Sequence, residues 1–143
     1  MEHETRHKPG RYIALQIAGR YYAIWSESIR EMMPMPELFN FENAMPGMIG
    51  FSHVQGTRIP VFDLHPRLEP GKGRLLKFTS QTRLLIAEVH GVKTGFLADR
   101  LTDMIQARAH EMKKETIYGH GRPKLIVVLE ELWPSTELAE LAA

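Results

Sequence analysis

The chain of 143 residues contains no cysteine. Disulfide bonds, thiolate nucleophiles and zinc sites with cysteine ligands are therefore excluded. The chain also lacks a large excess of either charge. It contains 18 lysines and arginines and 17 aspartates and glutamates, which give a net charge of +1. Domains that bind nucleic acids usually carry a basic excess or a basic face. We therefore expect no nucleic-acid partner.

Long apolar runs are absent as well. No run approaches the roughly 20 residues that a membrane-spanning helix requires, so we expect no direct membrane insertion. The first ten residues, MEHETRHKPG, are polar and lack the apolar stretch of a signal peptide. We expect residues 1–10 to form a disordered tail, residues 11–143 to form a single domain, and the protein to be cytoplasmic.

Short apolar runs separated by glycine-containing turns recur along the chain. Runs rich in β-formers flank Ala18–Arg20 and His90–Gly91, and each pair predicts a β-hairpin. A further strand pair is expected around the turn at Gln55–Gly56. The run Leu-Ile-Val-Val-Leu within Lys124–Leu129 predicts a strand buried on both faces. The regular spacing of about seven to nine short strands is typical of an all-β sandwich or barrel.

Prolines limit where regular elements can lie. Pro34 and Pro36 argue against a regular element at their positions, and the preceding run, residues 29–33, fits either a strand or a helical turn. Pro60 lies within a predicted strand, which places it at a sheet edge or among the strand's first residues. Helix is expected only as short turns near residues 37–46 and 63–68 and as a C-terminal helix.

Candidate catalytic and metal-binding patterns are weak. The seven histidines contain no HExxH motif and no pair at i, i+4 on a predicted helix, so we expect no metal site. His53, Asp63 and His65 flank one strand pair and could form the acid–base site of a small hydrolase-type enzyme. Asp63 more simply caps the turn that follows it. We therefore predict no catalytic residue, no cofactor and no small-molecule substrate.

Five of the eight methionines fall close together in the sequence. They are Met32, Met33, Met35, Met45 and Met48. Because the flexible thioether fills irregular gaps and adapts to several partners, the cluster fits an adaptable core around the proline-containing segment or a partner-binding surface.

Residues 47–64, GMIGFSHVQGTRIPVFDL, carry a more specific pattern. This segment resembles the signature of the CheW-like domain of chemotaxis coupling proteins, with its glycines, its Pro-Val-x-Asp-Leu ending and their spacing. The matching positions are Gly50, Val54, Gly56, Pro60, Val61, Asp63 and Leu64. Ile29–Met32, Thr94–Leu101 and the closing run at Leu125–Leu132 also resemble segments of that family, in the same order.

The resemblance implies two small, intertwined, five-stranded SH3-like β-barrels, with the last strand returning to the first barrel. It also implies an adaptor that couples the cytoplasmic tip of chemoreceptors to the regulatory domain of a histidine kinase, recruited to membrane-bound receptor arrays. The implied receptor contacts are Ile29, Glu31, Gln55, Leu101 and Met104. The residues implied to support the backbone are Gly50, Gly56, Pro60, Asp63, Gly95 and Asp99.

Two positions depart from the family pattern. The family's asparagine and arginine are His53 and Gln55 here. In the family that arginine can pair with the glutamate that matches Glu31, and Gln55 cannot form this ion pair. A divergent domain that serves another signalling pathway, such as a pilus, gliding or second-messenger system, is therefore the alternative to ordinary receptor coupling.

Overall fold

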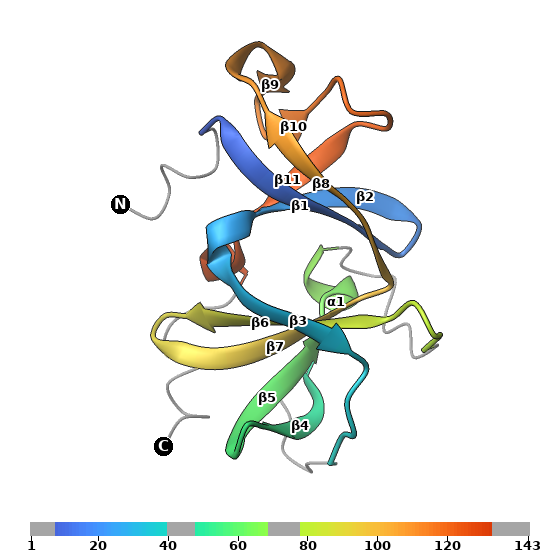
Figure 1. The fold of residues 1–143 in the computed structure, drawn as a ribbon, viewed down its shortest axis with the longest axis vertical. Helices are drawn as coiled ribbons and strands as arrows, with labels where there is room; N and C mark the ends of the chain where they lie inside the picture. The colour runs from blue at the N-terminus through green and yellow to red at the C-terminus, as the bar shows by residue number, and fades with distance from the viewer. Residues whose placement is uncertain (1–7, 40–47, 69–77, 133–143) are drawn as a thin grey trace.

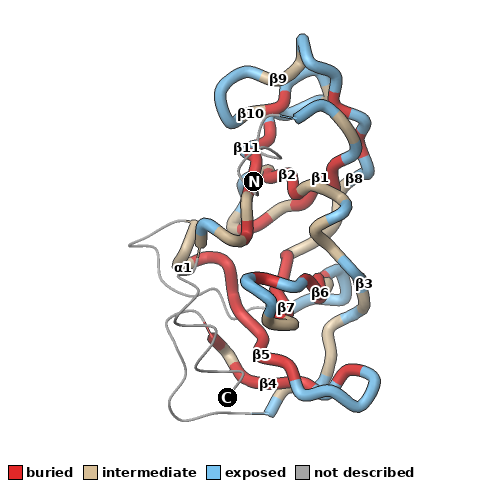
Figure 2. The backbone as a smooth tube through the Cα atoms, turned by 90° about the vertical axis from the view of Figure 1, so that its left-hand side faces the viewer, coloured by how far each residue is buried: buried red, intermediate tan, exposed pale blue. Residues whose placement is uncertain are grey.

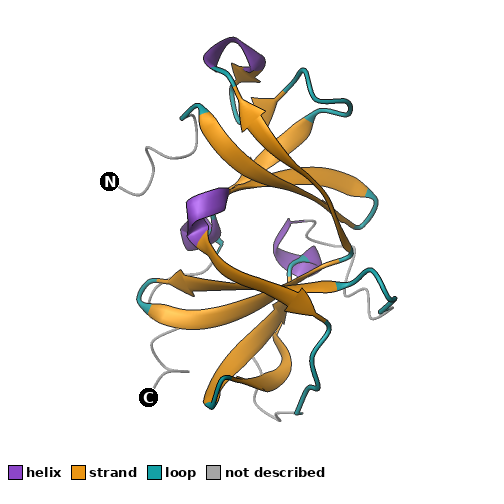
Figure 3. Ribbon diagram, in the orientation of Figure 1, coloured by secondary structure: helices purple, strands orange, loops and turns teal. Residues whose placement is uncertain are grey.

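The computed structural model describes residues 8–39, 48–68 and 78–132, which form two β-sheets stacked along the long axis of the molecule (Figure 1). The six-stranded sheet has the order β8-β1-β2-β11-β10-β9, and the five-stranded sheet has the order β3-β6-β7-β5-β4. Helix among the described residues is limited to single turns (Figure 3). The prediction of a mainly β fold is confirmed.

The six-stranded sheet contains β1 (Gly10–Ile17), β2 (Arg20–Trp25), β8 (Arg100–Ala107), β9 (Met112–Lys113), β10 (Thr116–Ile117) and β11 (Lys124–Val127). The five-stranded sheet contains β3 (Ile29–Pro34), β4 (Met48–Val54), β5 (Thr57–Asp63), β6 (Arg83–Val89) and β7 (Val92–Ala98). The helical turns are η2 (Ser26–Ser28), α1 (His65–Leu68), η3 (Ala109–Glu111) and η4 (Leu129–Glu131).

The five-stranded sheet is an insertion between two parts of the six-stranded sheet. The chain leaves the six-stranded sheet after β2, passes through η2 into β3, and returns from β7 to β8 across Asp99 alone. Strand β11 then pairs in parallel with β2, with Leu125 opposite Tyr22. The last strand thus returns to the part of the fold where the chain began, as the resemblance implies.

The two sheets do not close into complete barrels over the described residues. Each ladder has two ends, formed by β8 and β9 in one sheet and by β3 and β4 in the other. An isolated antiparallel bridge between Phe39 and Phe51 nevertheless joins the segment after β3 to β4, through two backbone hydrogen bonds of 2.8 Å. The five-stranded sheet therefore curls toward a barrel.

Among the described residues, three of the four hairpins with two-residue turns have glycine as the second turn residue. In each of these three turns a non-glycine residue with φ near +50° precedes a glycine with φ between +76° and +81°. Positive φ at both central positions is the geometry of the type I′ turn, whose twist matches that of the flanking strands. The three turns are Ala18–Gly19, Gln55–Gly56 and His90–Gly91.

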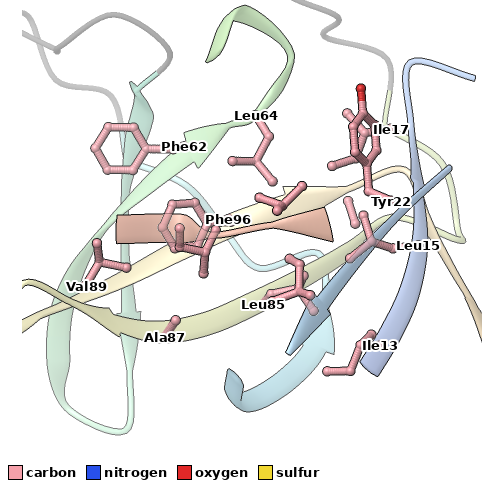
Figure 4. Close-up of a cluster of buried hydrophobic side chains, with 14 of the residues drawn as sticks. Ile13, Leu15, Ile17, Tyr22, Phe62, Leu64, Leu85, Ala87, Val89 and Phe96 are labelled. Carbon is pink, nitrogen blue, oxygen red and sulfur yellow. The ribbon is translucent and has the colours of Figure 1, made fainter. Parts of the chain in front are cut away.

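Strand β1 is buried on both faces and belongs to two cores. Tyr12 and Ala14 pack into a cluster within the six-stranded sheet, whereas Ile13, Leu15 and Ile17 point into a core shared by both sheets. Alternate residues of a strand point to opposite faces, which explains this division. Figure 4 shows the shared core, where side chains of β1 and β2 meet those of β5, β6 and β7. Figure 2 shows how buried backbone continues from one half of the molecule to the other.

Two expectations about proline need correction. Pro34 is the last residue of β3, where an edge strand tolerates its missing N–H. Pro60 lies in the interior strand β5 and not at a sheet edge. It is tolerated because the pairing of β5 with β7 begins only at Val61, so β5 has no neighbour on that side at Pro60.

Other expectations hold in part. The turn after residue 63 is α1, as predicted, whereas residues 37–39 contain no helix. Strand β11 is not buried on both faces throughout, because Leu125 is 44% exposed. Residues 1–7, 40–46 and 133–143 lie outside the described residues, so the disordered tail, the remainder of the turn near 37–46 and the C-terminal helix stay predictions. Gly10, which was assigned to the tail, is the first residue of β1.

Candidate functional site

A groove of about 240 Å³ lies where residues of β1, β3 and β8 meet. Because β3 belongs to one sheet and β8 to the other, the groove is built from both halves of the molecule. We call it the methionine groove. Its lining residues are Ile13, Met32, Leu101, Thr102, Asp103 and Met104.

Two β-bulges shape the strands on either side of this groove. In β3, Ile29 and Glu31 pair with successive residues of β6, which leaves Arg30 as the extra residue. In β8, Thr102 is the extra residue, since Leu101 and Asp103 pair with successive residues of β1. A bulge bends its strand and redirects the neighbouring side chains. The bulges therefore help to set which residues of β3 and β8 face the groove.

Methionine side chains dominate the exposed wall of the groove. Met32 is 43% exposed and Met104 is 48% exposed, whereas Leu101 is half-buried against the shared core. Exposed methionines adapt their shape to different apolar surfaces at little cost in strain. The arrangement suits the docking of an apolar side chain from a partner protein.

The clustered methionines serve both roles considered from the sequence, since some pack in the core and one lies at a surface groove. Met48 is buried in the shared core, and Met33 and Met35 are half-buried against the core of the five-stranded sheet. Met32 alone among the described members of the cluster reaches the groove. Met45 lies outside the described residues. Met32 was not among the predicted contact residues, because nothing in the local sequence marks the bulge in β3.

The structure brings together only some of the five predicted receptor contacts. Leu101 and Met104 share the groove. Ile29 and Glu31 lie on β3, the strand that carries Met32, where Ile29 is half-buried against the shared core.

Gln55 lies apart from the other four, in the exposed turn between β4 and β5. Glu31 lies on β3 and Gln55 follows β4, and these are the two end strands of a ladder that curls toward a barrel. Figures 1 and 2 both place this turn at the lower end of the molecule, away from β8. The predicted contacts therefore do not form one continuous patch around the groove.

Two of the glycines predicted to support the backbone have close neighbours. At Gly50, where φ is +153°, an added Cβ would lie 2.5 Å from the carbonyl oxygen of Phe39, which belongs to the isolated bridge. At Gly95 an added Cβ would lie 2.8 Å from Cδ1 of Leu84 in a buried part of the sheet. Gly56 has open space around it, and there only its φ of +81° favours glycine.

Asp63, His65 and Asp99 form a polar cluster at the junction between the sheets. The Asp63 carboxylate accepts a hydrogen bond of 2.9 Å from the backbone N–H of His65 and also contacts Nδ1 of that histidine. Nε2 of His65 lies 3.7 Å from Oδ2 of Asp99. The same Asp99 oxygen accepts a hydrogen bond of 2.9 Å from the N–H of Ala18. The cluster thus ties the start of α1 to the β1–β2 turn.

The structure does not assemble the acid–base site considered for His53, Asp63 and His65. His53 is exposed, pairs with Arg58 across the β4–β5 ladder, and packs edge-on against Phe39. Asp63 lies on β5 five residues beyond Arg58, the partner of His53. Five residues of an extended strand span about 16 Å. The three side chains therefore cannot act on one substrate atom.

No group of three or more histidine, aspartate and glutamate side chains within residues 8–39, 48–68 and 78–132 is placed to hold a metal ion. In the same part of the chain, no helix is both long and apolar enough to cross a bilayer.

Comparison with known proteins identifies the family. The profile described as "CheW-like domain" matches residues 11–129. The chemotaxis protein CheW of Bacillus subtilis (strain 168) is 22% identical over 103 residues, which cover 72% of this chain and 64% of that protein, so the match spans less than two thirds of that relative. The crystal structure of the scaffolding protein TtCheW from Thermoanaerobacter tengcongensis superposes with a TM-score of 0.75 at 18% identity, and the match covers 87% of this chain and 92% of that one. The chain therefore belongs to the CheW-like domain family.

Proposed function

We propose that this protein is an adaptor in chemotaxis-type signalling, which binds the regulatory domain of a histidine kinase and the cytoplasmic tip of a chemoreceptor. The observation that carries the proposal is the methionine groove, an exposed apolar site formed jointly by both sheets of a CheW-like domain. The proposal locates the protein in the cytoplasm, recruited to receptor arrays. Residues 11–143 act as one domain in this account.

The groove is assigned to the receptor. Leu101 and Met104, which the family resemblance implies as receptor contacts, line it together with Met32. Burial of such side chains in a partner contributes about 1.5–3 kcal/mol for each fully covered residue. An interface of this kind, built on a few apolar anchors with a polar rim, suits reversible signalling contacts.

Titration calorimetry with a receptor-tip fragment and with the kinase regulatory domain tests the proposal. Met104→Glu should weaken receptor binding at least tenfold, because it introduces a charge into an apolar contact, which corresponds to about 1.4 kcal/mol or more. Phe78→Glu is the matched control, since Phe78 is similarly exposed, at 44%, and does not line the groove. Equal affinities of the two variants for the receptor fragment would refute the assignment of the groove.

A second candidate is an adaptor for another signalling pathway. The observation that favours it is Gln55, which replaces the family's arginine while Glu31 remains. In that case the protein binds neither the receptor fragment nor the kinase domain, but Met104→Glu still impairs the binding of its own partner. The same calorimetric experiment separates the two candidates.

A further inference from the structure

A second depression, on the six-stranded sheet, differs from the methionine groove in its chemistry. It has a volume of about 240 Å³ and is rich in cationic side chains. We call it the cationic pocket. Its lining residues are Tyr21, Arg100, Thr102, Asp103, His120, Arg122 and Lys124.

Lys124 is a buried cation, with an exposure of only 4%. Its Nζ donates hydrogen bonds to the carbonyl oxygens of His120, at 2.5 Å, and Arg122, at 2.9 Å. An ammonium group has three N–H donors, and these two carbonyls use two of them. Burial lowers the pKa of Lys124, and the opposing influence of Asp103 is the smaller one. The pocket therefore holds a buried ammonium group whose charge is only partly compensated.

Two arginines add to this positive charge. Arg122 is exposed, and its guanidinium carbon lies 5.3 Å from the centre of the Tyr21 ring, which supports it in a cation–π contact. Arg100 donates from Nε to the side-chain oxygen of Gln16 at 2.7 Å. Its terminal nitrogens have no hydrogen-bond partner among the described residues.

A hydroxyl group in the pocket also lacks a partner. Oγ1 of Thr102 is buried and makes no hydrogen bond within the described residues. Thr102 is the bulged residue of β8, so its position is displaced from the regular ladder. Burial of an unpaired hydroxyl usually costs about 1–3 kcal/mol. A ligand that hydrogen-bonds with this group would remove that cost.

The acidic groups nearby do not neutralise the pocket. Glu111 receives a hydrogen bond of 2.8 Å from the N–H of Arg108 and one of 2.9 Å from Nε2 of His120, and these contacts lower its pKa. Its carboxylate is thus held by the backbone of Arg108 and by His120 of the lining. Among the residues that the structure describes, Asp103 is the one carboxylate in that lining, against two arginines and Lys124. A surplus of about two positive charges remains, which matches the charge of a phosphate group near pH 7.

We propose that the cationic pocket binds a phosphate group, either as free inorganic phosphate or as the monoester of a small molecule. Arginine and lysine together offer charge-assisted hydrogen bonds to phosphate oxygens, and the Thr102 hydroxyl adds one more polar partner. The site makes this adaptor-type domain responsive to a small anion. This inference does not depend on the partner proposed for the methionine groove.

Amide chemical shifts of the full chain, titrated with sodium phosphate at constant ionic strength, test the proposal. Saturable shifts at Thr102 and Lys124, with a dissociation constant in about the millimolar range, are expected. A parallel titration with glycerol 3-phosphate distinguishes the two sources, because tighter binding of the ester indicates a small-molecule ligand and tighter binding of phosphate indicates the free ion. Acetate serves as the carboxylate probe.

Arg122→Gln is the informative variant, because Arg122 is exposed and its loss leaves the buried Lys124 in place. It should weaken phosphate binding about fivefold or more, through the loss of one charge-assisted contact. Arg30→Gln is the matched control, since it removes one exposed positive charge on β3, outside the pocket, and should change the affinity less than about twofold. Non-saturable shifts, equal effects of the two variants, or acetate binding as tight as that of phosphate would each overturn the proposal.

Discussion

At the scale of single residues, Gln55 is one of the two positions that depart from the family pattern. It occupies the first central position of a type I′ turn, with φ of +51°, and is exposed. Its side chain therefore contributes little to the core and is available to a partner. Glu31 keeps the negative charge that the family's arginine can balance.

Gln55→Arg should leave the melting temperature nearly unchanged, because two long, unbranched side chains bear similar strain in the left-handed region and an exposed ion pair contributes only about 0–1 kcal/mol. It should change the affinity for a receptor-tip fragment by a factor of about three or more at low salt, where charges are least screened. Thermal unfolding and calorimetry measure the two effects. Equal affinities at low salt would mean that Gln55 has no role in partner choice.

Tyr12 makes the stability of the folded protein depend on pH. The ring is fully buried, its hydroxyl donates a hydrogen bond of 2.7 Å to the carbonyl of Lys8, and burial raises its pKa from 10.0 to about 12. Between these values the unfolded chain loses the tyrosine proton while the folded chain keeps it. The free energy of unfolding should therefore fall as pH rises from 10.0 to about 12.

Denaturant unfolding at pH 9, 10 and 11 checks this expectation, with Tyr12→Phe as the control. The variant should be less stable at neutral pH, by about 0.5–1.5 kcal/mol for the lost hydrogen bond. It should also lose less stability than the parent between pH 10 and 11. Parallel pH profiles of the two proteins would show that Tyr12 does not carry this dependence.

At the scale of the elements, the hairpin turns were the most predictable feature of the fold. Three of the four two-residue hairpin turns among the described residues end in glycine, and glycine supplies positive φ at no steric cost. The helical turn α1 follows from an equally local pattern. Local chemistry could not predict the two parallel pairings, β5 with β7 and β11 with β2, because they join segments far apart in the sequence.

The bulges explain why the candidate site was only partly predicted. An extra residue such as Thr102 in β8 or Arg30 in β3 changes which side chains point outward, and nothing in the local sequence marks it. Leu101 and Met104 were therefore found through family resemblance, whereas Met32 was missed. The grouping of His53 with Asp63 failed because His53 lies beside the β4–β5 turn, whereas Asp63 lies at the far end of β5.

Gly56→Val tests the turn between β4 and β5. Valine at φ of +81° carries about 1–3 kcal/mol of strain, although the space around the position is open. The melting temperature should fall by about 2–4 °C for each kcal/mol. Thr57→Val, which places the same side chain at the first residue of β5, is the control and should leave it nearly unchanged. If both variants melt with the parent, Gly56 is simply a permissive turn residue.

At the scale of the whole molecule, the two sheets are held together by the shared core and by the polar cluster of Asp63, His65 and Asp99. Asp99 occupies the single-residue crossing from β7 to β8 and also fixes the β1–β2 turn through the N–H of Ala18. A groove built from both sheets keeps its shape only while these contacts hold. The stability of the junction and partner binding are therefore linked.

Asp99→Ala should lower the free energy of unfolding by about 1–2 kcal/mol, because the N–H of Ala18 loses its acceptor. Asp99→Asn keeps an acceptor oxygen in the same position and should recover most of that loss. Denaturant unfolding of the three proteins measures the difference. If asparagine destabilises the protein as much as alanine does, the hydrogen bond to Ala18 is not the source of the effect.

An adaptor must bind both signalling proteins at the same time. Simultaneous binding of the receptor and the kinase therefore tests the adaptor role most directly. The full chain, a receptor-tip fragment and the kinase regulatory domain are mixed and separated by size-exclusion chromatography with light scattering. The account predicts a ternary complex that contains all three proteins, and a receptor-free complex of the other two when Met104→Glu replaces the parent chain. Mutually exclusive binding of the two partners, or no binding of either, would contradict the adaptor role.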